Sequence, residues 1–356
     1  MKSRITAFVV IGTMIALFAV VGCSDDNGQA KPKGVFAEAL DSVAAAVADN
    51  VAETAVVRKP ESTNTLMPTA AIATEPAESI RTVTDMVLKD QILYGVFDGG
   101  VLVYDFNDDS QFTLAVPERL QTIAVHQNTV YVGGDYLYTL VGEDLRRLDY
   151  EFEGVINALE PYGYALMIGT EAGLYTVGVF GREKLLDDMA VTALAAEPEA
   201  LWVGTRGNGL YHWDGVDFRK RYLLRDEALF DTVFTLDYQH DHLYMGTSNG
   251  LHIFDGGRWN TLTVADGLPS NALTSVDASG WVVHAIADEV VFSFYGGLID
   301  QIGELDGYGA TVVRQKGRRL LVGTAEQGIV MKSGRLVRTL VAPGPDKEKN
   351  TFTLNH

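Results

Sequence analysis

One short pattern recurs along the chain: an apolar run ending in Gly-Thr, a Gly-containing turn, and a second apolar run. Residues 201–215 read LWVGTRGNGLYHWDG, and residues 243–256 read LYMGTSNGLHIFDG. Fainter copies occur at 166–175 and 321–330, around Gly95 and Gly133, and along 282–285. One copy exposes apolar faces that only neighbouring copies can bury, so the pattern predicts a repeat architecture.

The spacing of the copies predicts the size of the repeat unit. The anchor positions are 95, 133, 169, 204, 246, 285 and 323, with a mean separation of 38 residues. That length fits four short strands and their turns, which make one blade of a β-propeller. No strong helical pattern interrupts the array. The sequence therefore predicts an all-β fold, a propeller of about seven blades over residues 80–342.

The clearest copy predicts four strands, a to d, from the inside of a blade outwards. Gly204 lies in strand b, where a missing side chain lets neighbouring blades approach closely. Asn208-Gly209 is typical of a hairpin turn, because both residues accept positive φ. The predicted strands are 191–195, 201–205, 210–213 and 218–223.

Two motifs resemble a known repeat family. The run LWVGTxxxGLY from Leu201 and the segment DGLPSNALTSV at 266–276 are similar to the two-component regulator propeller repeat. The resemblance is poor in blade 6, where Ala285 and Ile286 replace Gly-Thr. The family builds periplasmic sensor regions of bacterial hybrid histidine kinases, so the resemblance implies a sensor-type propeller. The chain ends at His356 without a kinase domain, and any signalling role is expected to need a separate partner.

The N-terminus predicts export and lipid attachment. A basic start precedes an uncharged apolar stretch at 5–21, as in a signal peptide, here residues 1–22. The sequence VVGC at 20–23 resembles a bacterial lipobox, which implies lipidation of Cys23 and anchoring in a lipid membrane. Ser24 follows the cysteine, which favours the outer membrane by the sorting rule of enteric bacteria. The expected location is the cell envelope, at the periplasmic face of the outer membrane.

The segments around the propeller have distinct compositions. Apolar residues three or four apart at 35–57 predict an amphipathic helix, and the Pro- and Thr-rich stretch 58–79 predicts a linker. Residues 23–34 form the lipidated N-terminus and tether, and 343–356 form a tail or a closing strand. Either 351–354 or 69–73 could add a strand that ties the ring ends together.

Charge and motifs exclude several functional classes. The net charge of −19 argues against nucleic acid as a partner, because nucleic-acid binding needs a basic surface. Cys23 is the only cysteine, which excludes a disulfide within the chain. No phosphate loop, nucleophile elbow or dinucleotide fingerprint is present, so the chain is expected to be no enzyme and to need no cofactor.

Propeller geometry predicts where a ligand or protein partner binds. The b–c turns and the d–a links between blades share one face, and the longest links border blades 4 and 5. The polar residues on this face also have a purely structural explanation, because turns favour Asn and Gly. The candidate residues on this face are Arg206, Asn208, Arg225, Asp226, Asp231, Ser248, Asn249 and Asn271.

Three other groups of polar residues allow weaker hypotheses. His240 and His242 flank a turn and allow a metal pair, although a solvated turn is favoured. The acidic segment 105–110 has oxygen ligands at alternate positions but lacks the central Gly of a calcium loop, which favours a β-turn. The inner strands offer polar groups toward the axis but no matching His or Glu ring: Asp85, Asn157 and Asp237.

These observations favour a non-catalytic binding module for an unknown protein or small molecule. One alternative is an outer-membrane assembly scaffold, although the Gly and Trp signature of that propeller lipoprotein is absent. Another is a propeller enzyme of the lactonase or lyase type. The fold alone does not separate these functions.

Overall fold

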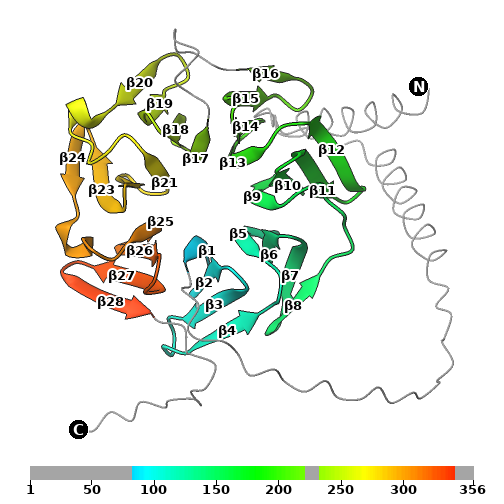
Figure 1. The fold of residues 1–356 in the computed structure, drawn as a ribbon, viewed down its shortest axis with the longest axis horizontal. Helices are drawn as coiled ribbons and strands as arrows, with labels where there is room; N and C mark the ends of the chain where they lie inside the picture. The colour runs from blue at the N-terminus through cyan, green and yellow to red at the C-terminus, as the bar shows by residue number, and fades with distance from the viewer. Residues whose placement is uncertain (1–81, 221–231, 341–356) are drawn as a thin grey trace, which may run out of the picture. The chain divides into compact units, whose positions relative to one another are not determined.

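The computed structural model describes residues 82–220 and 232–340, which form seven four-stranded antiparallel sheets around one axis (Figure 1). Each sheet is one blade, and its four strands follow one another in the chain, with the first nearest the axis. The predicted all-β, seven-bladed propeller is confirmed.

The strands of blades 1 to 4 are β1 (Val83–Lys89), β2 (Ile92–Phe97), β3 (Gly100–Asp105), β4 (Gln111–Ala115), β5 (Leu120–His126), β6 (Thr129–Gly134), β7 (Leu137–Val141), β8 (Asp144–Arg147), β9 (Ile156–Tyr162), β10 (Ala165–Thr170), β11 (Gly173–Gly178), β12 (Gly181–Asp187), β13 (Val191–Glu197), β14 (Ala200–Thr205), β15 (Leu210–Trp213) and β16 (Phe218–Lys220). The strands of blades 5 to 7 are β17 (Val233–Gln239), β18 (His242–Thr247), β19 (Gly250–Phe254), β20 (Trp259–Leu262), β21 (Leu273–Asp277), β22 (Val283–Ala287), β23 (Val290–Tyr295), β24 (Leu298–Gln301), β25 (Ala310–Lys316), β26 (Arg319–Thr324), β27 (Ile329–Ser333) and β28 (Leu336–Leu340). Two short 3₁₀ helices, η1 (Val264–Asp266) and η2 (Gly303–Leu305), lie in the links that follow blades 5 and 6.

The hydrophobic core lies between the blades. One cluster joins Leu137 of blade 2 to Ile156 and Ile168 of blade 3, and another joins Trp202 of blade 4 to Val233 of blade 5. Both faces of a sheet are therefore buried, which explains why the b strands read as nearly continuous apolar runs.

The ring closes by direct contact between blades 7 and 1. Val83 of β1 packs in one cluster with Leu321 and Ile329 of blade 7. The Thr311 hydroxyl donates a hydrogen bond to the Val83 carbonyl at 2.6 Å. The two segments predicted as closing strands, 69–73 and 351–354, lie outside the described residues. Blades 1 and 7 each contain four strands from their own stretch of chain.

The expected role of glycine in the b strands is confirmed. A Cβ placed on Gly204 would lie 2.6 Å from Cγ1 of Val233, the first residue of the next inner strand. A Cβ on Gly169 would lie 2.5 Å from Cγ1 of Val191 in the same way. Both distances are well inside van der Waals contact, so glycine lets adjacent blades pack.

Two of the predicted anchor positions, 95 and 285, each lie one residue before the true position in the strand. Val96 pairs with Asp85, and Ile286 with Ser275, as Gly246 pairs with Thr235 in blade 5. Ile286 and Ala287, not Ala285 and Ile286, therefore replace Gly-Thr in blade 6. Ile286 packs in one cluster with Ala310 of the next inner strand. A small residue there provides the space that glycine provides elsewhere.

This packing rule predicts a coupled pair of substitutions. Gly204→Ala should lower the free energy of unfolding by about 2 kcal/mol, because the new methyl overlaps Val233. The double variant Gly204→Ala/Val233→Ala should lose less than the sum of the two single losses. Urea unfolding of the four proteins measures both. Strictly additive losses would show that the two positions do not compete for the same space.

Several predicted segments lie outside the described residues and stay predictions: 1–22, 23–34, 35–57, 58–79 and 343–356. Within the described ranges, no helix has the length and apolar character needed to cross a bilayer.

Candidate functional site

The strand order divides the turns between two faces of the ring. We call the face with the b–c turns and the links between blades the link face, and the face with the a–b and c–d turns the base face. The described candidates lie in b–c turns or links, as predicted: Arg206, Asn208, Ser248, Asn249 and Asn271. The remaining three lie outside the described residues: Arg225, Asp226 and Asp231.

Arg206 and Asn271 each bind a partner within the link face. The Arg206 guanidinium lies 3.2 Å from the Glu171 carboxylate of blade 3, an acid that the sequence did not single out. The Asn271 side-chain oxygen accepts a hydrogen bond from the Val264 N–H at 2.8 Å, at the start of η1. The structure brings Arg206 and Glu171 together but supports turn chemistry for Asn271.

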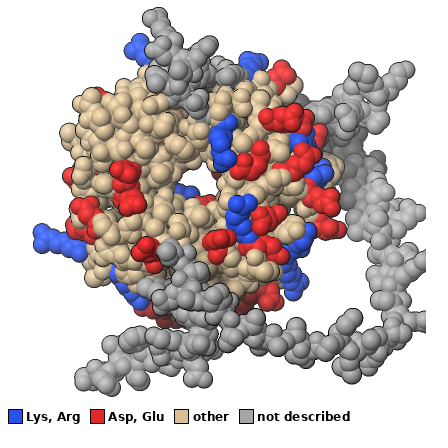
Figure 2. All heavy atoms as spheres, viewed as in Figure 1, with Lys and Arg blue, Asp and Glu red and all other residues tan. Residues whose placement is uncertain are grey.

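A layer of charged side chains lies on the inner strands around the axis. The fifth residue of strand a is charged in four blades: Glu160, Asp237, Asp277 and Arg314. The Arg314 guanidinium lies 2.7 Å from the Asp85 carboxylate and donates to the Met86 carbonyl at 3.2 Å. Figure 2 shows an opening at the centre of the ring, and charged side chains gathered over blades 2 to 4.

The acids of this layer connect successive blades. Each accepts a hydrogen bond from a backbone N–H of the following blade. Glu160 accepts from Ala196 at 3.2 Å, and Asp237 accepts from Ala278 at 2.6 Å. Asp85, two residues earlier in its strand, accepts from Ile123 at 3.1 Å. Comparing the fifth residue of each inner strand would have revealed Glu160, Asp277 and Arg314, which the sequence analysis missed.

Burial changes the protonation of this layer. It raises the pKa of Glu160 to about 8, and the nearby Asp237 raises it as well. Burial also raises the pKa of Asp237 to about 6. For Arg314, burial lowers the pKa, but the surrounding carboxylates raise it above its usual value overall, so the guanidinium stays charged. The layer can hold a proton near neutral pH.

The favoured interpretations of the histidine and acidic turns are supported. His242 Nδ1 lies 2.7 Å from the His240 carbonyl, while the His240 ring stacks on Trp281 at 5.0 Å. In the 105–110 turn, the Asp105 carboxylate accepts from the Asn107 N–H at 2.8 Å. Within the described residues, no group of three or more His, Cys, Asp or Glu side chains is arranged to hold a metal ion.

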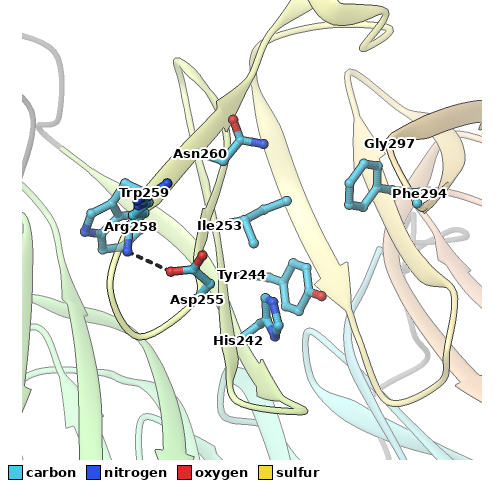
Figure 3. Close-up of a pocket in the computed structure, with 10 residues that line it drawn as sticks. His242, Tyr244, Ile253, Asp255, Arg258, Trp259, Asn260, Phe294 and Gly297 are labelled. Carbon is cyan, nitrogen blue, oxygen red and sulfur yellow. Dashed lines mark hydrogen bonds between the residues drawn. The ribbon is translucent and has the colours of Figure 1, made fainter.

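A groove of about 500 Å³ lies between blades 5 and 6, at the base face (Figure 3). Tyr244, Ile253 and Phe294 supply its apolar walls, with Phe294 facing the other two across the gap. His242, Asp255 and Asn260 are among its polar lining residues. The sequence prediction missed this groove, because it chose the link face and because the lining residues come from two different blades.

Similarity to known proteins is limited to the fold. No family model matches the chain, and no curated protein matches its sequence. The PorZ protein, a surface component of the type-IX secretion system of Porphyromonas gingivalis, superimposes with a TM-score of 0.57 at 12% identity, over 75% of this chain and 39% of that one. The WD40 propeller of Doa1 superimposes with a TM-score of 0.56 at 14% identity, over 71% of this chain and 93% of that one.

The extracellular domain of BT4673 from B. thetaiotaomicron gives a TM-score of 0.46 at 17% identity, over 72% of this chain and 40% of that one. The superpositions on PorZ and on the Doa1 propeller show a shared fold with this chain. Identities this low establish a shared architecture and no shared function.

Proposed function

We propose that this chain is a non-catalytic ligand-binding propeller of the bacterial cell envelope, held at a membrane by a lipid on Cys23. The observation that carries the proposal is the groove between blades 5 and 6. Its volume of about 500 Å³ falls within the usual range of small-molecule sites, and it combines apolar walls with a few polar groups.

The lining residues define the class of ligand. The aromatic rings of Tyr244 and Phe294 suit a ligand with a flat apolar face, because aromatic rings pack well against such a face. His242, Asp255 and Asn260 suit hydrogen-bonding groups along the ligand edge. We therefore propose a small amphipathic molecule, with one apolar face and a polar edge.

The contacts of the inner polar residues support a binding role over catalysis. The axis-facing residues that a lactonase or lyase would use already bond to neighbouring blades. Asn157 donates to the Val191 carbonyl at 3.1 Å, and Asp237 accepts from Ala278 at 2.6 Å. We further propose that ligand binding is passed to a separate signalling partner, in line with the resemblance of the repeats to a sensor-type family.

Phe294→Ala should weaken ligand binding about tenfold, because it removes one aromatic wall of the groove. Thermal shift against sugars, aromatic carboxylic acids and short acyl amines identifies a ligand class, and titration then gives the two affinities. Asn208→Ala, on the link face, is the control and should bind as the wild type does. A ligand that is lost from Asn208→Ala but kept by Phe294→Ala would place the site on the link face and reject the groove.

The proposed anchor has its own measurement. Mass spectrometry of the chain purified from membranes should show a processed N-terminus with a diacylglyceryl group on Cys23. The Cys23→Ala variant should remain unprocessed. A mature chain without lipid would reject the anchor and leave the groove proposal standing.

A further inference from the structure

Exposed apolar side chains are concentrated on the base face. Among the described residues, eleven large apolar side chains are exposed, and nine of them lie in or beside a–b and c–d turns. These nine are Val141, Tyr164, Val179, Phe180, Val216, Trp281, Tyr295, Leu298 and Leu336. The other two, Phe234 and Val264, lie toward the link face.

Turn exposure by itself does not explain this asymmetry, because the b–c turns of the link face also expose residues to solvent. Their exposed residues are polar or small, as in Arg206 to Asn208 of blade 4, or Asp288 and Glu289 of blade 6. Exposed apolar residues that are grouped together mark an interaction surface, whereas single ones are normal on any protein. The base face therefore exposes apolar side chains in addition to charged ones such as Asp90, Asp214 and Asp255, whereas the b–c turns of the link face expose polar or small residues.

The apolar residues of the base face form two groups on opposite sides of the ring. Blade 3 presents Tyr164 and Phe180, and Phe180 is 94% exposed. Blade 6 presents Trp281, 82% exposed, with Leu298. Figure 1 places these two blades across the axis from each other. A small ligand cannot span both groups, whereas a broad, flat partner touches them together.

We propose that the base face rests on a lipid bilayer, with the turns of blades 3 and 6 inserted at the interface; this rests on the proposed lipid anchor. Tryptophan, tyrosine and phenylalanine at turn tips are the side chains that favour the membrane interface. The net charge of −19 disfavours attraction to anionic lipid, so the contact depends on apolar insertion into zwitterionic lipid.

Because the lipid anchor already holds the chain at the membrane, weak insertion of the apolar turns is enough to orient the propeller. Fifty-eight residues separate Cys23 from Thr82, the first described residue. A chain of that length can span at most about 200 Å, so the tether alone lets either face reach the bilayer. It does keep the propeller at high local concentration beside the membrane. The apolar turns then select the base face, and the groove between blades 5 and 6 lies beside the lipid.

The test uses the full lipidated chain in phosphatidylethanolamine–phosphatidylcholine vesicles. Cys23 is the only cysteine and its thiol is proposed to carry the lipid, so one added cysteine takes a single environment-sensitive fluorophore. Phe180→Cys and Leu298→Cys report on blades 3 and 6. Val264→Cys is the matched control, an exposed apolar residue in a link. Melting temperatures equal to that of the wild type confirm that the labelled chains are folded.

Spin-labelled lipid should quench the Phe180 and Leu298 labels about threefold more strongly than the Val264 label, because only the first two are inserted. Equal quenching at all three positions, or none, would overturn the proposal. Labels that are shielded only after envelope proteins are added would also overturn it, since the partner is then a protein.

Flotation of the vesicles separates this proposal from the anchor. If the chain does not float, the same labels are read with vesicles added from outside. Selective quenching of the Phe180 and Leu298 labels then keeps the docking face and rejects the anchor. No quenching rejects both.

Discussion

Arg314→Met should lower the free energy of unfolding by about 3 kcal/mol, at the low end of the range for breaking one side of a buried ion pair. The Arg314 guanidinium lies 2.7 Å from Asp85 and also donates to the Met86 and Val313 carbonyls. The bonds to Asp85 and Met86 join blade 7 to blade 1. Its side chain keeps 33% of its surface accessible along the channel, so water offsets part of the loss.

A second substitution identifies the source of that loss. Asp85→Asn in the Arg314→Met background should recover part of the stability, because it removes the carboxylate left without its cation. Arg338→Met is the control, since Arg338 pairs with Asp109 at 3.1 Å on the surface, and should cost less than about 1 kcal/mol. Urea unfolding of the wild type and the three variants measures these losses. Equal losses for Arg314→Met and Arg338→Met would show that ring closure does not depend on the buried pair.

Raising the pH from 6.5 to 8.5 should lower the free energy of unfolding by about 2 kcal/mol, and Glu160→Gln should abolish most of that change. Burial raises the pKa of Glu160 from 4.5 to about 8. In this window the unfolded carboxyl has already lost its proton, whereas the folded one still holds it. The folded state therefore loses stability until the pH passes about 8.

The pH window isolates this group from others. Burial lowers the pKa of His252 to about 4, and the pKa of Asp237 is about 6, so both act mainly below pH 6.5. Glutamine keeps the oxygen that accepts from the Ala196 N–H at 3.2 Å, and only the ionisation is lost. Glu199→Gln, at an exposed turn, should keep the wild-type pH dependence. A Glu160→Gln variant that keeps the full pH dependence would assign it to another group.

The repeat pattern was sufficient to predict the number and order of the blades, because each blade is a local unit of consecutive strands. Strand boundaries in blade 4 follow from Asn208-Gly209 and from the apolar run at 201–205. Register was harder to predict in blades 1 and 6, where a side chain replaces the anchor glycine. There the hairpin pairing and the bulge in strand a set the alignment, and Val96 and Ile286 occupy the position.

The candidate site was only partly predictable. The face of Arg206 and Asn208 follows from strand order, but the pairing of Arg206 with Glu171 depends on two blades meeting. The groove beside Phe294 has the same origin, since blade 5 and blade 6 each supply one wall. The sequence pattern of one repeat does not predict which side chains of the next repeat will face it.

The sequence by itself determined the propeller and its repeat length, because hydrogen bonding within a blade and apolar alternation are encoded over short stretches of chain. Only the tertiary structure decided which residues from distant parts of the chain lie next to each other in the ring. The Asp85–Arg314 pair joins residues from opposite ends of the propeller, and Glu160 acquires its raised pKa from burial among inner strands. The apolar base face also depends on the ring, since Phe180 and Leu298 share a surface only after seven blades have closed around one axis.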